Sequence, residues 1–255
     1  MPAPGVAREA TPADLADPAT WAGAEIVLLG EVHDNPAHHA NQAAAVAALA
    51  PAAVVWEMLT PAGAASVDLS LDPEALGEAL GWEEAGWPDF AMYAPIFAAA
   101  ADAEHLGAAL TPDGLRTAAE VGAAEILGAG AASLGLDAPY PPARQAEVEA
   151  LMDEAHCNML PADMLPGMVE VQRARDGALA LAALAALERT GGPVAVILGN
   201  GHATAEGVPA LIAAARPETR LRALGQFEAP TEDAPFDLWA VAEPAPRGDP
   251  CEAFR

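Results

Sequence analysis

Three short apolar runs constrain the fold of this chain more than any other feature. Residues 24–30 (AEIVLLG), 52–58 (AAVVWEM) and 193–199 (PVAVILG) are apolar, include β-branched residues, and are too short for buried helices. Such runs are typical of strands that are covered on both faces, as in parallel sheets. Between the first two runs, Asn35 and Pro36 suit the N-cap and first residue of a helix over 35–50. The pattern predicts an α/β fold with a mostly parallel sheet flanked by helices.

The rest of the chain divides into a sheet region and a helical region. Further strands are expected at 106–110, 219–224 and 236–241 and helices at 93–105 and 200–215, whereas residues 1–20 are expected to be irregular. Residues 113–190 show no strand pattern, only alanine-rich helical segments interrupted by prolines. We therefore predict an α/β sheet domain formed by residues 1–112 and 191–255, and a helical insertion subdomain formed by residues 113–190.

The composition excludes several classes of partner. The net charge of −26 opposes binding to nucleic acid and to anionic membrane surfaces. No segment is long and apolar enough for membrane insertion, and the N-terminus lacks the features of a signal peptide or lipid anchor, so a cytoplasmic protein is expected. Cys157 and Cys251 are far apart in the sequence and form neither a disulfide framework nor a paired metal motif, which makes a reducing compartment acceptable.

Ionisable side chains follow each of the three core strands. The first strand leads into GEVHDN, which contains Glu31 and His33, the second ends at Glu57, and the third leads into GNGH, which contains His202. Ligand sites of open α/β sheets lie beyond the carboxyl ends of the strands, so these four side chains are expected to share one cleft. An unpaired buried carboxylate is costly, and Glu57 is therefore expected to face this cleft and its histidines.

Two kinds of chemistry suit this set of side chains. Two histidines with one or two carboxylates form a ligand set for a divalent metal such as Zn, Mn or Fe. The same residues, Glu31, His33, Glu57 and His202, can also act as a general acid–base cluster without metal. His38 and His39 lie inside the predicted helix 35–50 and are expected to be solvated, and His105 has no evident partner.

The predicted insertion contains a second unusual stretch. Four of the seven methionines lie at positions 152, 159, 164 and 168, close to His156, and an aromatic group precedes the insertion at Trp82, Trp87, Phe90, Tyr93 and Phe97. Methionine at helical spacing is typical of an adaptable core, but flexible apolar walls with a few donor atoms also suit a porphyrin. Both interpretations remain open from these residues alone.

Five collinear motifs resemble one family. The segments LLGEVHDNPAHHANQ, VVWEM, GW…GWPDFAMYAPIFAAA, HCNMLP…MVEVQRARDGALA and VILGNGHATAEGVPALI cover about residues 26–212 and are similar to the haem-binding uptake proteins of the ChaN-like group in the Tiki superfamily. The resemblance implies an α/β sheet with a helical subdomain, and haem bound with tyrosine ligation in an apolar pocket at a homodimer interface. It places Glu31, His33, Glu57 and His202 on the shared strand-end motif.

The resemblance leaves two functions in view. As a binding protein, the chain would bind haem and serve haem or iron uptake or handling, with Tyr93, Tyr140 and His156 as the candidate haem-binding residues. Distant relatives implied by the same resemblance are hydrolases, and the second hypothesis is a metal-dependent esterase or peptidase that uses the strand-end cluster. The chain lacks a G-x-S-x-G motif, which argues against a serine nucleophile.

Overall fold

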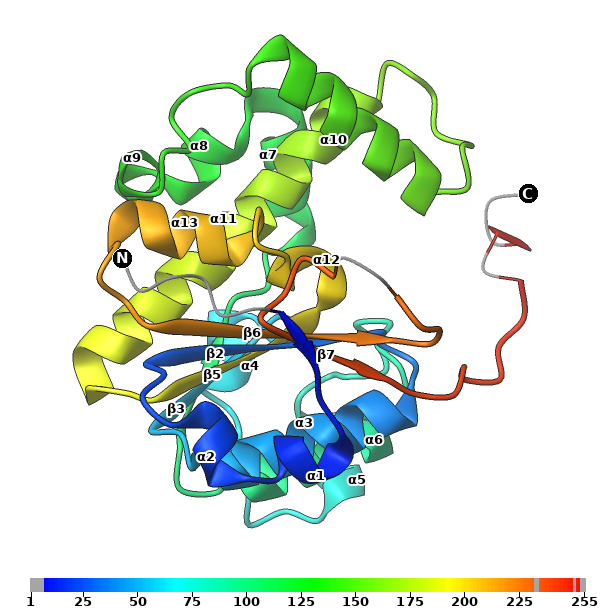
Figure 1. Ribbon diagram of the computed structural model, residues 1–255. Helices are drawn as coiled ribbons and strands as arrows, with labels where there is room; N and C mark the ends of the chain where they lie inside the picture. The colour runs from blue at the N-terminus through cyan, green and yellow to red at the C-terminus, as the bar shows by residue number, and fades with distance from the viewer. Residues whose placement is uncertain (1–6, 232–233, 250, 253–255) are drawn as a thin grey trace. The chain divides into compact units, whose positions relative to one another are not determined.

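The computed structural model describes residues 7–231, 234–249 and 251–252, and the chain divides into two compact units (Figure 1). Unit 1 consists of Met1–Ala109 and Leu179–Ala245, and unit 2 of Leu110–Ala178 and Pro246–Arg255. The boundaries differ from the predicted ones: unit 2 begins at Leu110 rather than at 113, and two longer stretches are grouped differently. The long helix α11 (Leu165–Thr190) contributes its last residues, from Leu179, to unit 1, and the residues from Pro246 onward are grouped with unit 2.

The described part of unit 1 contains a seven-stranded sheet in which every pair of neighbouring strands is parallel. The order of the strands is β1-β7-β6-β2-β5-β3-β4. This arrangement confirms the predicted α/β fold. The strands are β1 (Arg8–Glu9), β2 (Ile26–Glu31), β3 (Ala53–Trp56), β4 (Glu104–Gly107), β5 (Val194–Gly199), β6 (Leu221–Phe227) and β7 (Leu238–Val241).

The three runs that predicted the fold form β2, β5 and β3, which are neighbours in the sheet. Every residue of these three strands is buried. Strand β5 lies between β2 and β3, with Glu31 opposite Gly199 and Trp56 opposite Ile197. Because the strands are parallel, Glu31, Gly199 and Glu57 come together at one carboxyl edge of the sheet.

Helices flank this sheet on both faces. Figure 1 shows α1, α2, α3, α5 and α6 on one side of the sheet and α13 on the other. On the first side, the apolar side chains of β2, β3 and β5 pack against α3 and α6 in one buried core. The helices of unit 1 are α1 (Pro12–Leu15), α2 (Pro18–Trp21), α3 (Pro36–Leu49), α4 (Pro61–Ala64), α5 (Pro73–Ala79), α6 (Phe90–Ala99), α12 (Asn200–Ala203) and α13 (Val208–Ala215).

Local capping explains where several of these helices begin. The Asn35 side chain accepts a hydrogen bond from the Ala37 N–H at 3.0 Å, with Pro36 at the first helical position, as expected for α3. The prediction that residues 1–20 are irregular was wrong for the described residues 7–20, which contain β1, α1 and most of α2. Thr11 and Asp17 cap the two short helices, each directly before a proline. The predicted strand 106–110 lies earlier, as β4, because α6 already ends at Ala99.

The described residues of unit 2 form helices joined by turns and loops. Its helices are α7 (Pro112–Val121), α8 (Ala123–Leu127), α9 (Ala129–Ser133), α10 (Pro142–Ala155) and the first part of α11. A core of small residues, Ala118, Ala123 and Ala174, lets these helices approach closely. Gly177 belongs to this close packing, because a Cβ atom there would make Leu127 and Leu136 move their side-chain ends. None of the described helices in either unit is long and apolar enough to cross a membrane.

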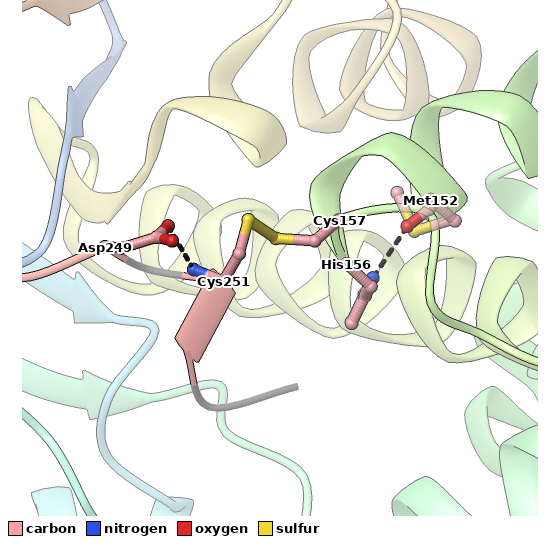
Figure 2. Close-up of a disulfide and its surroundings, with 5 residues drawn as sticks. All are labelled: Met152, His156, Cys157, Asp249 and Cys251. Atoms are coloured by element: carbon pink, nitrogen blue, oxygen red, sulfur yellow. Dashed lines mark hydrogen bonds between the residues drawn. A yellow bond between two sulfur atoms is a disulfide. The ribbon is translucent and has the colours of Figure 1, made fainter. Parts of the chain in front are cut away.

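A disulfide ties the two parts of unit 2 together. Cys157 follows α10 and Cys251 lies in the C-terminal segment, and their Cα atoms are 5.8 Å apart (Figure 2). The sequence interpretation, which saw no disulfide framework in two distant cysteines, missed this bond. Ninety-four residues separate the two cysteines in the sequence, so only the folded chain brings them together.

Candidate functional site: an acid–base cluster at the carboxyl edge of the sheet

Glycine at two strand ends makes room for the cluster. A Cβ atom at Gly30 would lie 2.5 Å from Oδ1 of Asn200, and one at Gly199 would lie 2.9 Å from Nε2 of His33. Both distances are shorter than non-bonded atoms tolerate. The glycine of the second G-x-x-H motif, Gly199, therefore makes space for the histidine of the first motif, His33.

Glu31 is the central acceptor of the cluster. Its side chain is fully buried, and its Oε1 accepts hydrogen bonds from the Tyr93 hydroxyl at 2.6 Å and from Nδ1 of His33 at 2.7 Å. Burial alone would raise the pKa of Glu31, but hydrogen bonding and charge interaction with His33 and His39 together lower it. The carboxylate is therefore held in its ionised form inside the protein.

His39 is a buried imidazolium that balances this charge. Its Nε2 faces the carbonyl oxygen of His33 at 2.8 Å, and its Nδ1 faces Oε1 of Gln42 at 3.2 Å and Oε2 of Glu31 at 3.4 Å. The Gln42 amide donates from Nε2 to the Leu29 carbonyl, which fixes its oxygen toward His39. Because both ring nitrogens face acceptors, both carry a proton. Burial opposes this charge, yet the hydrogen bond and charge interaction with Glu31 raise the pKa of His39.

Glu57 forms the second half of the cluster. Its Oε2 accepts a hydrogen bond from the Gly199 N–H at 2.6 Å. Its Oε1 lies 3.3 Å from Nε2 of His202 and 4.0 Å from Nε2 of His33. Glu57 is buried, as its position next to a core strand suggested, and it faces the two histidines of the G-x-x-H motifs.

His33 is the member of the cluster that reaches the surface. About a third of its side chain is exposed, at 34 %, whereas the side chains of Glu31, Glu57 and His202 are almost fully enclosed. Burial lowers the pKa of His33, but the hydrogen bond that His33 donates to Glu31 and the charges of Glu57 and Glu31 outweigh this effect and raise it. Proton exchange with solvent or with a substrate would therefore occur at His33.

The four predicted residues thus come together, with their polar atoms directed mainly at one another and at the backbone. In the described part of the chain, no group of three or more His, Cys, Asp or Glu side chains is arranged to hold a metal ion. The donor atoms that would be needed are directed at one another. Nδ1 of His33 is bonded to Glu31, and one oxygen of Glu57 is occupied by a backbone N–H. The expectation of a divalent-metal site at Glu31, His33, Glu57 and His202 is not supported.

Two residues of the network differ from the sequence interpretation. His38 and His39 were expected to be solvated, yet both are fully buried. Nδ1 of His38 accepts a hydrogen bond from the Val32 N–H at 3.0 Å, and burial lowers the pKa of His38. A helix that directly follows a core strand must pack its first turn against the sheet edge. The pair His39-x-x-Gln42 lies on one face of that turn, and this spacing could have indicated its role.

The two tyrosines lie in very different surroundings. Tyr93 on α6 is fully buried, and its pKa is raised by burial and by the charge of Glu31, so its phenol stays protonated. Tyr140 in unit 2 is half-buried, with the guanidinium carbon of Arg173 at 4.6 Å and that of Arg144 at 5.9 Å from its ring centroid. Burial raises the pKa of Tyr140 while Arg173 opposes this rise. Of the two, Tyr140 is the phenol that a ligand can reach.

The remaining candidates are placed as follows. His156 is half-buried directly before Cys157, and its Nδ1 lies 2.7 Å from the Met152 carbonyl oxygen (Figure 2). His105, which had no evident partner in the sequence, accepts a hydrogen bond from the Trp56 indole at 3.0 Å. The aromatic group that was proposed as a porphyrin wall is mostly core of unit 1, with Trp82, Phe90, Tyr93 and Phe97 buried and Trp87 half-buried.

The fold and the cluster define an α/β protein with a buried acid–base network at the carboxyl edge of a parallel sheet. The family described as "Haem-binding uptake, Tiki superfamily, ChaN" matches residues 18–212. Because this match covers most of the chain, the protein belongs to the ChaN haem-binding uptake family. No curated protein matches the chain.

Solved structures with a related fold include a member of the same family. The structure described as cofacial haem binding to ChaN of Campylobacter jejuni has a TM-score of 0.64 at 18 % identity, over 84 % of this chain and 86 % of that chain. A succinoglycan biosynthesis protein has a TM-score of 0.44 at 12 % identity, over 83 % and 71 % of the two chains. An erythromycin esterase mutant in its open conformation has a TM-score of 0.41 at 14 % identity, over 85 % and 75 %.

Proposed function

We propose that this protein binds haem through unit 2 and serves haem or iron uptake or handling. Membership of the ChaN haem-binding family is the observation that carries this proposal. The exposed apolar side chains of unit 2 suit the binding of haem. Among the described large apolar side chains that are exposed, Val121, Leu151, Met159 and Met164 belong to unit 2, and such side chains can cover the faces of a porphyrin.

Tyr140 is the proposed axial ligand. When bound, the haem would supply a ferric iron, which favours an anionic oxygen donor. Arg144 and Arg173 would stabilise the negative charge of the Tyr140 phenolate. Arg173 is itself held in place by Glu170 Oε1 at 2.6 Å and by the Ala138 carbonyl oxygen at 2.6 Å. His156 is a second candidate donor of the same unit.

A homodimer belongs to the same proposal. The relative from Campylobacter jejuni is described as showing cofacial haem binding. If each chain binds one haem on the surface of unit 2, two chains would bring their haems together face to face. Size-exclusion chromatography with light scattering should then show a monomer that becomes a dimer when hemin is added. An unchanged mass would contradict this part of the proposal.

Titration of the purified protein with hemin tests the proposed ligand. We expect a saturable shift of the Soret band, which Tyr140→Phe should abolish or move to that of a different ligand. Tyr93→Phe is the matched control, because it removes the same hydroxyl from a buried position and should leave the spectrum unchanged. A wild-type spectrum identical to that of hemin alone would refute haem binding. Equal spectra for wild type and Tyr140→Phe would refute the ligand assignment alone.

One observation favours a second candidate function, ester hydrolysis at the cluster without a metal ion. Glu31 holds Nδ1 of the exposed His33 at 2.7 Å, which is the arrangement of a general base oriented by a buried carboxylate. His33 would take a proton from water as the water attacks an ester carbonyl. Glu57, which contacts His202, lies next to His33 and would stabilise the positive charge that His33 gains. Hydrolysis of p-nitrophenyl acetate should then fall with His33→Gln but not with His156→Gln. Equal rates in the two variants would refute this role.

The disulfide bears on the compartment in which the protein works. Disulfides persist in oxidising compartments and are rare in the cytosol. The Cys157–Cys251 bond therefore supports an oxidising compartment over the cytoplasmic location expected from the sequence. Alkylation of free thiols in intact cells of the source, followed by mass spectrometry, should recover the linked peptides. Recovery of two alkylated cysteines would contradict this proposal.

A further inference from the structure

A cleft in unit 1 lies outside both the cluster and the proposed haem site. It has a volume of about 700 Å³ and is lined by residues between Pro73, at the start of α5, and Ala91, in the first turn of α6. This volume is within the range of roughly 300–1,000 Å³ that is typical of small-molecule sites. Trp82, Trp87 and Phe90 form its aromatic part, together with Pro73 and Pro88.

Internal contacts hold the aromatic walls in place. The indole nitrogen of Trp82 donates a hydrogen bond to the Pro88 carbonyl oxygen at 2.8 Å, and its ring packs edge-on against Phe90 with centroids 5.1 Å apart. Gly77 on α5 lets Phe90 approach, since a Cβ atom there would lie 3.0 Å from Cγ of Phe90. The walls are therefore formed before any ligand binds, which lowers the entropic cost of binding.

The charge around the cleft has one sign only. Its lining contains five acidic residues and no arginine, lysine or histidine. Within the described part of the chain, none of these five carboxylates forms an ion pair. They are Glu74, Glu78, Glu83, Glu84 and Asp89, all of them exposed.

We propose that this cleft binds a small organic cation with an apolar body, such as a quaternary ammonium compound. Aromatic faces attract cations through their quadrupoles, and tryptophan does so best. The unpaired carboxylates add a favourable potential, while the aromatic and proline side chains would cover the methyl groups of such a ligand. An anionic ligand is disfavoured by the same charges.

The cleft also adjoins the acid–base cluster. The indole ring of Trp87, which lines the cleft, packs edge-on against the His33 ring with centroids 5.1 Å apart. A ligand that contacts Trp87 should therefore change the environment of His33. This contact gives the proposal a second readout, the NMR signals of the His33 ring, in addition to tryptophan fluorescence.

Titration with choline and with its uncharged isostere 3,3-dimethyl-1-butanol tests the proposal. Choline should quench or shift the tryptophan fluorescence saturably and move the His33 signals, and the isostere should bind at least tenfold more weakly. Trp87→Leu should weaken choline binding at least fivefold. Glu78→Gln, at an exposed position, should weaken it severalfold without affecting the fold. The matched control is Glu120→Gln, an exposed acid on α7 outside the cleft.

Three results would overturn the proposal. Absence of saturable choline binding would refute the proposal. Equal affinity for the uncharged isostere would show that the cleft is merely apolar. Equal weakening by Glu78→Gln and Glu120→Gln would show a general effect of net charge rather than a site. None of these results depends on whether the protein binds haem.

Discussion

Substitution of Glu31 by glutamine should show how strongly the buried cluster stabilises the fold. Glu31 accepts hydrogen bonds from Tyr93 and His33 through one oxygen, and its other oxygen lies 3.4 Å from Nδ1 of His39. Glutamine keeps one oxygen but places an amide N–H₂ group against a ring nitrogen that already carries a proton. The buried imidazolium of His39 then has no counter-charge.

The expected loss follows from the burial of this pair. Removing one partner of a buried ion pair typically costs about 3–5 kcal/mol of unfolding free energy. For a chain of this size, each kcal/mol lowers the melting temperature by roughly 2–4 °C. We therefore expect Glu31→Gln to lower the melting temperature by about 6–20 °C, as measured by calorimetry near neutral pH.

An exposed glutamate in the same unit supplies the control. The Glu218 side chain is 74 % exposed, and Glu218→Gln should change the unfolding free energy by less than about 0.5 kcal/mol. A double-mutant cycle of Glu31→Gln with His39→Gln should show a coupling of about 1 kcal/mol or more, since the two residues are in contact. If Glu31→Gln costs no more than Glu218→Gln, the assignment of a charged Glu31–His39 pair is wrong.

Three further predictions concern the same structure. The pKa of Glu31 is lowered from 4.5, so its contribution to stability should be lost as the pH falls through the folded-state pKa. The pKa values of His33 and His39 are raised from 6.5, so their contributions should be lost as the pH rises through the folded-state values. Melting curves from pH 3 to 10 should show both losses, and His39→Gln should have a smaller alkaline loss than the wild type. Tyr93→Phe removes a hydrogen bond to a buried carboxylate and should cost about 1.5–3 kcal/mol in denaturant unfolding, and an unchanged midpoint would refute that bond. Cys157→Ser removes the disulfide bond to Cys251, which lies 94 positions further along the sequence, and should destabilise the protein by roughly 2–5 kcal/mol. If neither this substitution nor a reductant changes the melting temperature, the bond does not form.

Most of the sheet could be predicted from the sequence because its central strands are buried on both faces. Continuous apolar runs of strand length leave few alternatives, and the glycine and charged residues behind them mark where each strand ends. The order of the strands could not be predicted in the same way. Strand β5 is inserted between β2 and β3 although more than 130 residues separate it from β3 in the sequence, and no local pattern specifies such a contact.

The candidate site shows the same division between local and long-range information. Glu31, His33, Glu57 and His202 could be identified because each follows a strand whose end was evident. The role of His39 was missed, because the spacing of His39 and Gln42 indicates only that the two side chains share a helix face, and not that this face is buried. Its burial depends on where α3 packs, which is a tertiary property.

The same limit applies to the metal interpretation and to the cysteines. Two imidazoles and two carboxylates in one place are compatible with either a metal or a proton network, and only the directions of their nitrogen and oxygen atoms decide between them. Cys157 and Cys251 are brought together by the packing of the C-terminal segment within unit 2. Composition and spacing carry no information about that packing.

Hydrogen–deuterium exchange with and without hemin tests the central claim of haem binding in unit 2 most directly. We predict that hemin slows the exchange of backbone amides in residues 140–164, which contain Tyr140, His156 and the exposed methionines, and leaves the amides of residues 31–39 and 199–203 unchanged. Protection confined to residues 31–39 and 199–203 would contradict the account, because haem would then bind at the acid–base cluster of unit 1.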